Sequence, residues 1–231
     1  VSDELAELLR LGKLGLPAGT ILPVYPSGPI CNTRGLTPMG TYLVERMIER
    51  GMIIHIDHMG VRTASAVLDL AEAANYPGVV SVHSWSDPSI VGRIIGLGGF
   101  VAGYAHAATD AGDGETPFLD EWRANTQGHT ISGYGMGSDV NGLGPLPPPQ
   151  LAPPAGPQTY PFTAVNGTTV HRQVFGTRTF DLNTDGVPQY GLYAEWVTDL
   201  IRQAGPDGPR LRGQLMNGAE AYVSMWEEAR A

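Results

Sequence analysis

The chain has 231 residues, which is enough for one α/β domain, and 16% of them are charged. The formal net charge of −9, with no basic run, argues against nucleic acid or an anionic membrane surface as a partner. Cys31 is the single cysteine, so an intrachain disulfide is excluded, and no apolar run approaches the roughly 20 residues of a membrane span. These features leave the compartment open between cytoplasmic and secreted.

Two helices are expected before the first strand. Ser2 is a suitable N-cap for the first helix, and Thr37 followed by Pro38 is a typical start for the second. Gly51 is expected to end the second helix. The intervening residues 16–31 are rich in proline and glycine and are expected to form a loop.

The residues after Gly51 predict a strand, a helix and another strand. Two short runs rich in β-branched residues, Met52–Ile56 and Val79–Val82, are predicted to be buried parallel strands. Between them, apolar residues spaced at i, i+3, i+4 and i+7 predict one face of a helix: Ala64, Val67, Leu68 and Ala71. A histidine follows each strand, His58 and His83. Active sites of α/β barrels form at the carboxyl ends of the strands, so these histidines are candidate site residues.

The same alternation continues along the chain. The expected elements are a helix at 88–96, a strand at 98–103, a helix near 117–125 and a strand at 131–139. A proline-rich loop and a hairpin around Asn166-Gly167 are expected to form an excursion over 144–190. Two closing helices are predicted at 191–204 and 219–229, and Tyr222, Val223 and Trp226 are expected to form the inner face of the second.

Four motifs occur in a characteristic order: GLT at 35–37, IDHMG at 56–60, VHSW at 82–85 and GSDVNG at 137–142. In this order and spacing the chain resembles the membrane-dipeptidase family of metal-dependent amidohydrolases, from about residue 32 to residue 226. The resemblance implies an α/β fold of the (β/α)8 TIM-barrel type. The chain would correspond to the C-terminal part of that barrel, as a single partial domain over 1–231.

The resemblance also implies a zinc-dependent dipeptidase-like hydrolase. His58 and His83 match histidines that bind one ion of a binuclear zinc centre, and Asp139 matches the carboxylate that handles the proton of the attacking water. Neutral imidazoles suit Zn²⁺, and a bound ion lowers the pKa of water to about 7. The implied reaction is attack of zinc-bound hydroxide on a dipeptide or another small amide, with one or two zinc ions in a complete site.

Other residues near these motifs receive supporting roles. Asp57 is expected to orient a neighbouring group, and His55, which stands where the family usually has an acid, is expected to pack or to support the site. Trp85 is a candidate for lining the substrate pocket, with plain packing as the alternative. Arg93 is a candidate for binding a substrate carboxylate, with a solvated helix face as the alternative. His106 could point into the same mouth, but an ordinary loop position is favoured.

The chain departs from the family in one important respect. The family's H-x-D pair for the other zinc has no match in the first 50 residues. Since about four strands cannot close a barrel, another chain or a second copy is expected to complete it. Two alternatives remain open: a non-catalytic structural or assembly subunit with an incomplete metal site, and a mononuclear amidohydrolase or lactonase that uses His58, His83 and Asp139.

Overall fold

A four-stranded parallel sheet organises the part of the chain that the structure describes. The computed structural model describes residues 33–83, 86–140 and 146–231, and the compact unit is Arg34–Ala231. The helix expected after Ser2 lies outside the described residues. The strands of the sheet lie side by side in chain order: β1 (Ile54–His55), β2 (Val79–Ser81), β3 (Phe100–Tyr104) and β4 (Gly135–Gly137). All three pairings are parallel, so the carboxyl ends of the strands share one edge.

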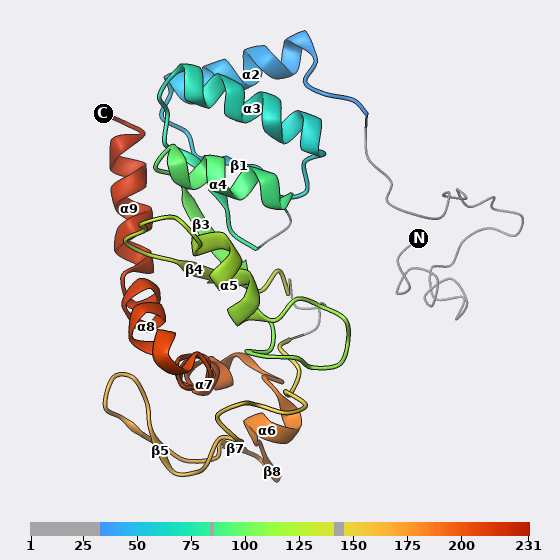
Figure 1. Cartoon of the computed structure of the whole chain (residues 1–231), viewed down its shortest axis with the longest axis vertical. Helices are drawn as coiled ribbons and strands as arrows, with labels where there is room; N and C mark the ends of the chain where they lie inside the picture. The colour runs from blue at the N-terminus through green and yellow to red at the C-terminus, as the bar shows by residue number, and fades with distance from the viewer. Residues whose placement is uncertain (1–32, 84–85, 141–145) are drawn as a thin grey trace, which may run out of the picture. The chain divides into compact units, whose positions relative to one another are not determined.

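The helices that connect the strands cover one face of this sheet. They are α3 (Val61–Ala73), α4 (Pro88–Gly96) and α5 (Phe118–Thr126), and α2 (Pro38–Glu49) packs next to α3. Figure 1 shows these helices stacked in chain order. The four residues predicted as the inner face of α3 are its buried residues, which confirms the helical spacing argument.

Local sequence explains where the helices begin. The Thr37 hydroxyl accepts a hydrogen bond from the Gly40 amide and caps α2, and the Asp87 carboxylate accepts one from Ser89 and caps α4. In both helices proline occupies the first turn, where its missing N–H costs nothing. The α2 start was predicted from Thr37 and Pro38.

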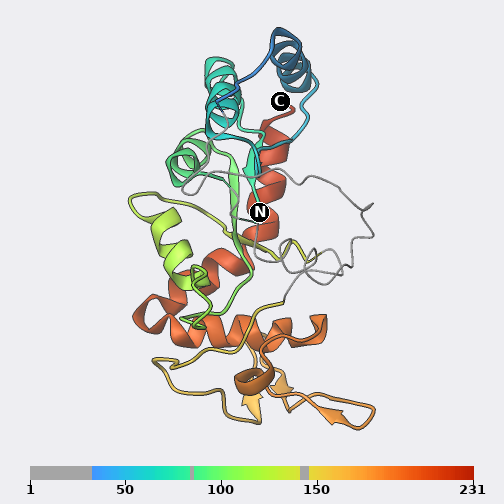
Figure 2. The same cartoon turned by 90° about the vertical axis from the view of Figure 1, so that its right-hand side faces the viewer.

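The opposite face of the sheet is covered by α9 (Gly218–Glu228). Met225 of this helix packs with Val80, Phe100 and Ala102 from two strands. Figure 2 shows the strands between α9 on one side and the connecting helices on the other. The described residues therefore form an α/β fold in three layers.

This layering bears on the expected barrel. The connecting helices mark the outer face of a βα barrel, so the face under α9 is the one that a barrel would enclose. In the described residues the four strands form an open sheet with two edges, as expected for too few strands to close a barrel alone, and a barrel itself is not seen. None of the described helices has the length and apolar character that crossing a membrane requires.

The excursion predicted at 144–190 contains two small hairpins instead of one. The first hairpin pairs β5 (Phe162–Thr163) with β6 (Thr169–Val170), and the second pairs β7 (Val174–Phe175) with β8 (Arg178–Thr179). The elements that follow the hairpins are α6 (Leu182–Asp185), η1 (Tyr190–Leu192), α7 (Tyr193–Gln203), η2 (Gly205–Asp207) and α8 (Gly208–Met216). The separate helix α8 was not predicted.

Three polar residues of α7 anchor this excursion. Glu195 accepts a hydrogen bond from the Tyr160 hydroxyl at 2.7 Å, and Asp199 accepts one from Gln150 at 2.5 Å. Gln203 accepts one from the Ala155 amide at 2.8 Å. These α7 residues are spaced by four, lie on one face of the helix and are buried. Buried polar groups require partners, and the irregular chain over 150–160 supplies them.

Candidate metal site

Three side chains at the carboxyl edge of the sheet form the candidate site. His58 follows β1, His83 follows β2 and Asp139 follows β4. The Nε2 atoms of His58 and His83 approach to 2.8 Å, and an oxygen of Asp139 lies 4.0 Å from His83 Nε2. One ligand atom from each residue lies within 4.8 Å of the others, so the three could hold a metal ion. The structure thus brings together all three residues that the sequence singled out.

The backbone at two of these residues is unusual. His58 has φ of 66° and Asp139 has φ of 47°, in the left-handed region that non-glycine residues rarely adopt. Such conformations cost free energy and tend to persist at functional sites, where the surroundings impose them. Both residues lie shortly after a strand of the sheet.

The spacing of the ligand atoms is on the scale of a site for a small divalent ion. In a tetrahedral zinc site with Zn–N distances near 2.0–2.1 Å, neighbouring ligand atoms lie about 3.3 Å apart. The distances of 2.8 Å and 4.0 Å bracket that value. Two imidazoles and one carboxylate suit zinc and several other divalent transition metals, so the donor set by itself does not specify zinc.

Asp57 orients His83 from behind. Its Oδ2 atom lies 3.3 Å from His83 Nδ1 and accepts a hydrogen bond from the Val82 amide at 2.7 Å. Its Oδ1 atom accepts hydrogen bonds from the hydroxyls of Ser81 at 2.6 Å and Ser86 at 3.0 Å. A carboxylate on Nδ1 directs the other ring nitrogen of His83 toward the candidate ion. This arrangement matches the orienting role expected for Asp57.

Burial and hydrogen bonds set the charge states of this pair. Burial raises the pKa of Asp57, but the hydrogen bonds from Ser81, Val82 and His55 and the nearby His83 together outweigh it and hold the pKa below its ordinary value. Burial lowers the pKa of His83 below its ordinary value, against the opposing effect of Asp57. At neutral pH the site therefore presents an ionised Asp57 and a neutral His83, and the neutral imidazole is the form that binds a metal.

Gly137 allows the last strand to come close enough. A side chain at this position would overlap the Val82 carbonyl oxygen and crowd the Cβ atom of His83 at 3.2 Å. Any larger residue would push β4, and with it Asp139, away from His83. The backbone at Gly137 therefore lies close to Val82 and His83, as only glycine allows here.

A second group of possible ligands overlaps the first. His55, Asp57 and His83 also bring ligand atoms within 4.8 Å of one another, and His55 Nε2 lies 2.6 Å from Asp57 Oδ2. The Asp57 oxygens already accept hydrogen bonds from Ser81, Ser86 and the backbone, as described above. A metal ion would have to displace these donors, so this group is the poorer candidate, and His55 serves as a partner of Asp57.

Of the two residues proposed for substrate binding, the structure describes only Arg93, which does not join this cluster. Trp85 lies outside the described residues. The Arg93 guanidinium contacts Glu72, Asp69 and the Ser65 hydroxyl, all on α3, at distances of 2.6–3.0 Å. These contacts tie α4 to α3 and account for the Arg93 side chain without a substrate.

His106 lies after β3 and is buried. Its Nε2 atom lies 3.1 Å from an oxygen of Asp113, and its backbone oxygen accepts a hydrogen bond from Trp196. It shares the carboxyl edge of the sheet with the candidate ligands but belongs to neither of the two groups described above.

The sequence did not predict that Ser81 and Ser86 donate hydrogen bonds to Asp57. For Ser81, the signal was a polar residue inside an apolar strand.

The chain was compared with known proteins. No family model, no curated protein and no solved structure matches it. The geometry of the site is therefore the main basis for any functional inference.

Proposed function

We propose that this protein is a metal-dependent hydrolase of the membrane-dipeptidase type, which cleaves a dipeptide or another small amide. The observation that supports this proposal is the convergence of His58, His83 and Asp139 from the carboxyl ends of β1, β2 and β4 of one sheet. The motif order in the sequence supports the same reading. We further propose zinc as the ion, because neutral imidazole is a preferred ligand of zinc.

Each residue has a distinct role in the proposed reaction. His58 and His83 would hold the ion, and Asp57 would keep His83 in its ligating orientation. When bound, a divalent ion supplies Lewis acidity and lowers the pKa of water. Asp139 would accept the proton of the attacking water and return it to the leaving amine. Its exposure is consistent with a group that meets the substrate.

The described residues favour one ion over two. His83 belongs to both possible ligand groups, and the hydrogen bonds to Asp57 disfavour the group that contains it. This observation supports the mononuclear amidohydrolase as a second candidate. The dipeptidase proposal includes a partner chain or a second copy, which would complete a barrel and add ligands for another ion.

Metal analysis and hydrolysis together test the proposal. Purified protein is dialysed against zinc, its metal content is measured by mass spectrometry, and hydrolysis of unsubstituted dipeptides is followed by amine release. We expect about one zinc per chain from the site described here. Asp139→Asn should lose about 10²-fold or more in kcat, because it removes the proton acceptor, and it should also weaken zinc binding, because Asp139 belongs to the ligand group. His83→Ala should lose both the bound zinc and the hydrolytic activity.

A matched histidine variant serves as the control. His171 is exposed in the loop before β7, and His171→Ala should keep both zinc and activity. Zinc binding without hydrolysis of any amide or lactone would favour the non-catalytic subunit. Failure of the wild-type protein to bind zinc or another divalent transition metal would refute the proposal.

A further inference from the structure

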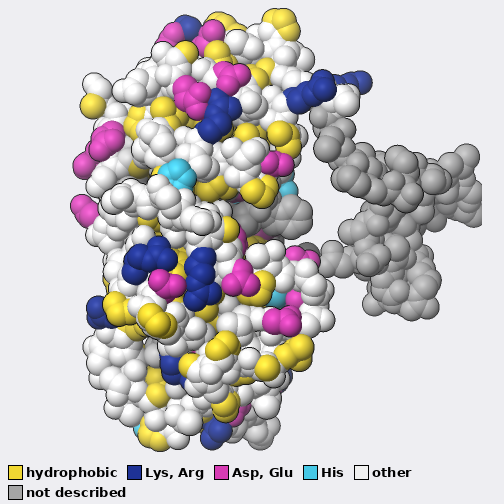
Figure 3. All heavy atoms as spheres, viewed as in Figure 1, with side chains coloured by type: hydrophobic (Ala, Val, Ile, Leu, Met, Phe, Trp, Pro, Cys, Tyr) yellow, Lys and Arg dark blue, Asp and Glu magenta, His cyan; other side chains and the backbone are white. Residues whose placement is uncertain are grey.

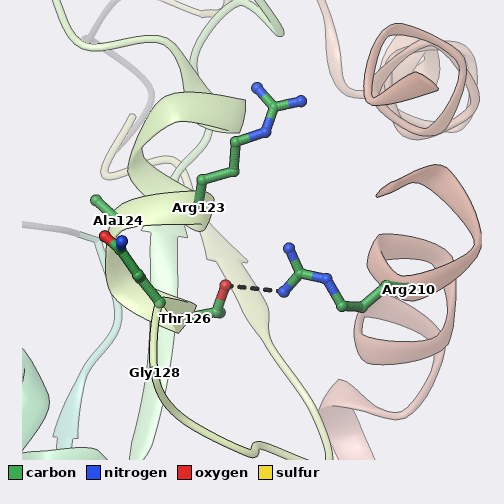
Figure 4. Close-up of a pocket in the computed structure, with 6 residues that line it drawn as sticks. Arg123, Ala124, Thr126, Gly128 and Arg210 are labelled. Atoms are coloured by element: carbon green, nitrogen blue, oxygen red, sulfur yellow. Dashed lines mark hydrogen bonds between the residues drawn. The ribbon is translucent and has the colours of Figure 1, made fainter. Parts of the chain in front are cut away.

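A pocket of about 670 Å³ lies between the end of α5 and the start of α8, apart from the candidate metal site. It is lined by two basic residues and by small or polar ones: Arg123, Ala124, Thr126, Gln127, Gly128 and Arg210. Figure 4 shows Arg210 reaching from α8 toward Thr126, and Arg123 extending from α5 into the space before the C-terminal helices. Basic side chains gather over this part of the surface in Figure 3, with acidic ones between them.

The Arg210 guanidinium is held in place before any ligand arrives. It lies over the Trp122 ring, 4.0 Å from the ring centroid, and donates a hydrogen bond to the Thr126 hydroxyl at 3.0 Å. Thr126 in turn donates to the Trp122 backbone oxygen at 2.8 Å. A guanidinium that is already ordered loses little conformational entropy when it binds an anion.

Two acidic neighbours match the two arginines in formal charge, but they pair with them only at long distances. Asp207 is shared between them: its carboxylate lies 3.3 Å from Arg123 Nε and 3.6 Å from Arg210 Nη2. Asp120 lies 3.5 Å from Arg123 Nη1 and is largely exposed. These distances exceed the 2.7–2.9 Å of strong charge-assisted hydrogen bonds. Each guanidinium carries five N–H donors, and these contacts occupy only part of them.

We propose that this pocket binds a phosphate group, either as inorganic phosphate or as part of a small phosphate monoester. Two guanidiniums from different helices can each donate a pair of hydrogen bonds to phosphate oxygens, which is the arrangement that favours arginine at phosphate sites. The Thr126 and Gln127 side chains add polar lining. The volume is in the range of small-molecule pockets and leaves room for an organic group beside the phosphate.

Phosphate titration of the metal-free protein tests this site independently of the proposed hydrolase activity. The full chain is treated with a chelator and dialysed, so that phosphate cannot bind through a metal ion near His83. Binding of inorganic phosphate is then measured at low ionic strength by calorimetry. We expect saturable binding that weakens as salt is added, because the interaction is between charges near the surface.

Paired variants identify the residues. Arg123→Gln with Arg210→Gln should weaken phosphate binding by about tenfold or more, the effect of losing charge-assisted hydrogen bonds. The control removes the same charge elsewhere, with Arg46→Gln and Arg178→Gln, whose guanidiniums pair with Glu49 and Asp185. If the double variant at the pocket fails to fold, Arg123→Gln alone replaces it, since its contacts are two partly exposed carboxylates.

The source of the phosphate group is decided by competition. Tighter binding of glycerol phosphate than of inorganic phosphate indicates a monoester, and the reverse order indicates the free ion. Tighter binding of succinate than of either overturns the assignment to phosphate. The proposal also fails if the wild-type protein shows no saturable phosphate binding, or if the control pair weakens binding as much as the pocket pair does.

Discussion

At the scale of single residues, the candidate site depends on Asp57 as much as on the ligands. This one carboxylate accepts hydrogen bonds from two serine hydroxyls and one backbone amide and contacts the rings of His55 and His83. It therefore connects the end of β1 to the chain that follows β2. The sequence identified Asp57 as an orienting group, but neither its serine partners nor the atom of His83 that it faces.

Asp57→Asn should weaken metal binding by about 10- to 100-fold, the usual effect of losing the partner of a metal-ligating histidine. Asparagine presents one oxygen, so its amide nitrogen would face a donor and leave a buried group unpaired. Zinc affinity is measured by competition with a chromophoric chelator, with circular dichroism to check folding. His55→Ala, which removes a half-exposed ring from the same carboxylate, should change the affinity less. Unchanged affinity in Asp57→Asn would remove Asp57 from the site.

At the scale of elements, α7 buries a polar face of the helix instead of exposing it to solvent. Glu195 is fully buried and pairs with Tyr160, and Gln173 approaches its other oxygen at 3.3 Å. Periodicity alone predicts that Glu195, Asp199 and Gln203 face solvent. The excursion over 150–190 reverses this, because it supplies a donor for each of them.

The stability of this anchor should depend on pH. Burial raises the pKa of Glu195 above its ordinary value, against the hydrogen bonds from Tyr160 and Gln173. A raised folded-state pKa means that the stability contribution is complete below the unfolded pKa of about 4.3 and is lost as pH rises through the folded pKa. Relative to Glu195→Gln, the wild-type protein should therefore lose free energy of unfolding between acidic and neutral pH.

Urea unfolding of both proteins at pH 4.5 and at pH 8 measures this difference. Comparing the two proteins at each pH cancels the titration of every other group. The exposed variant Glu220→Gln controls for the loss of a surface carboxylate. If the free energies of unfolding of wild type and Glu195→Gln differ by the same amount at both pH values, the expected rise in the pKa of Glu195 is contradicted.

At the scale of the whole described unit, α9 is the layer that covers the second face of the sheet. Its buried Met225 packs on Val80, Phe100 and Ala102. The sequence predicted a closing helix here with Tyr222, Val223 and Trp226 inward, yet these three side chains are 38–43% exposed. Tyr222 still contacts the Phe100 ring, at 5.4 Å between centroids.

Met225→Ala should lower the free energy of unfolding by about 2–5 kcal/mol, because it opens a cavity between α9 and the sheet. Met216→Ala in α8 is the matched control: Met216 is 53% exposed, and its removal should change stability by less than about 0.5 kcal/mol. Urea denaturation of the three proteins measures both values. Equal stability of wild type and Met225→Ala would mean that α9 does not seal this face.

The sequence by itself determined the local features of this protein. The capped start of α2, the buried face of α3, the parallel strands and the histidines at their ends follow from residue spacing, which depends only on neighbours along the chain. The grouping of His58, His83 and Asp139 into one candidate site came from the resemblance to the membrane-dipeptidase family, and the structure brings these three side chains together.

Only the tertiary structure decided the features that depend on distant partners. It placed α9 over the sheet, buried the polar face of α7 and engaged Arg93 with α3. It also brought Arg123 and Arg210 to one pocket from positions far apart in the chain. The free energy of a polar or apolar side chain depends on what it contacts, and periodicity along one segment carries no record of that contact.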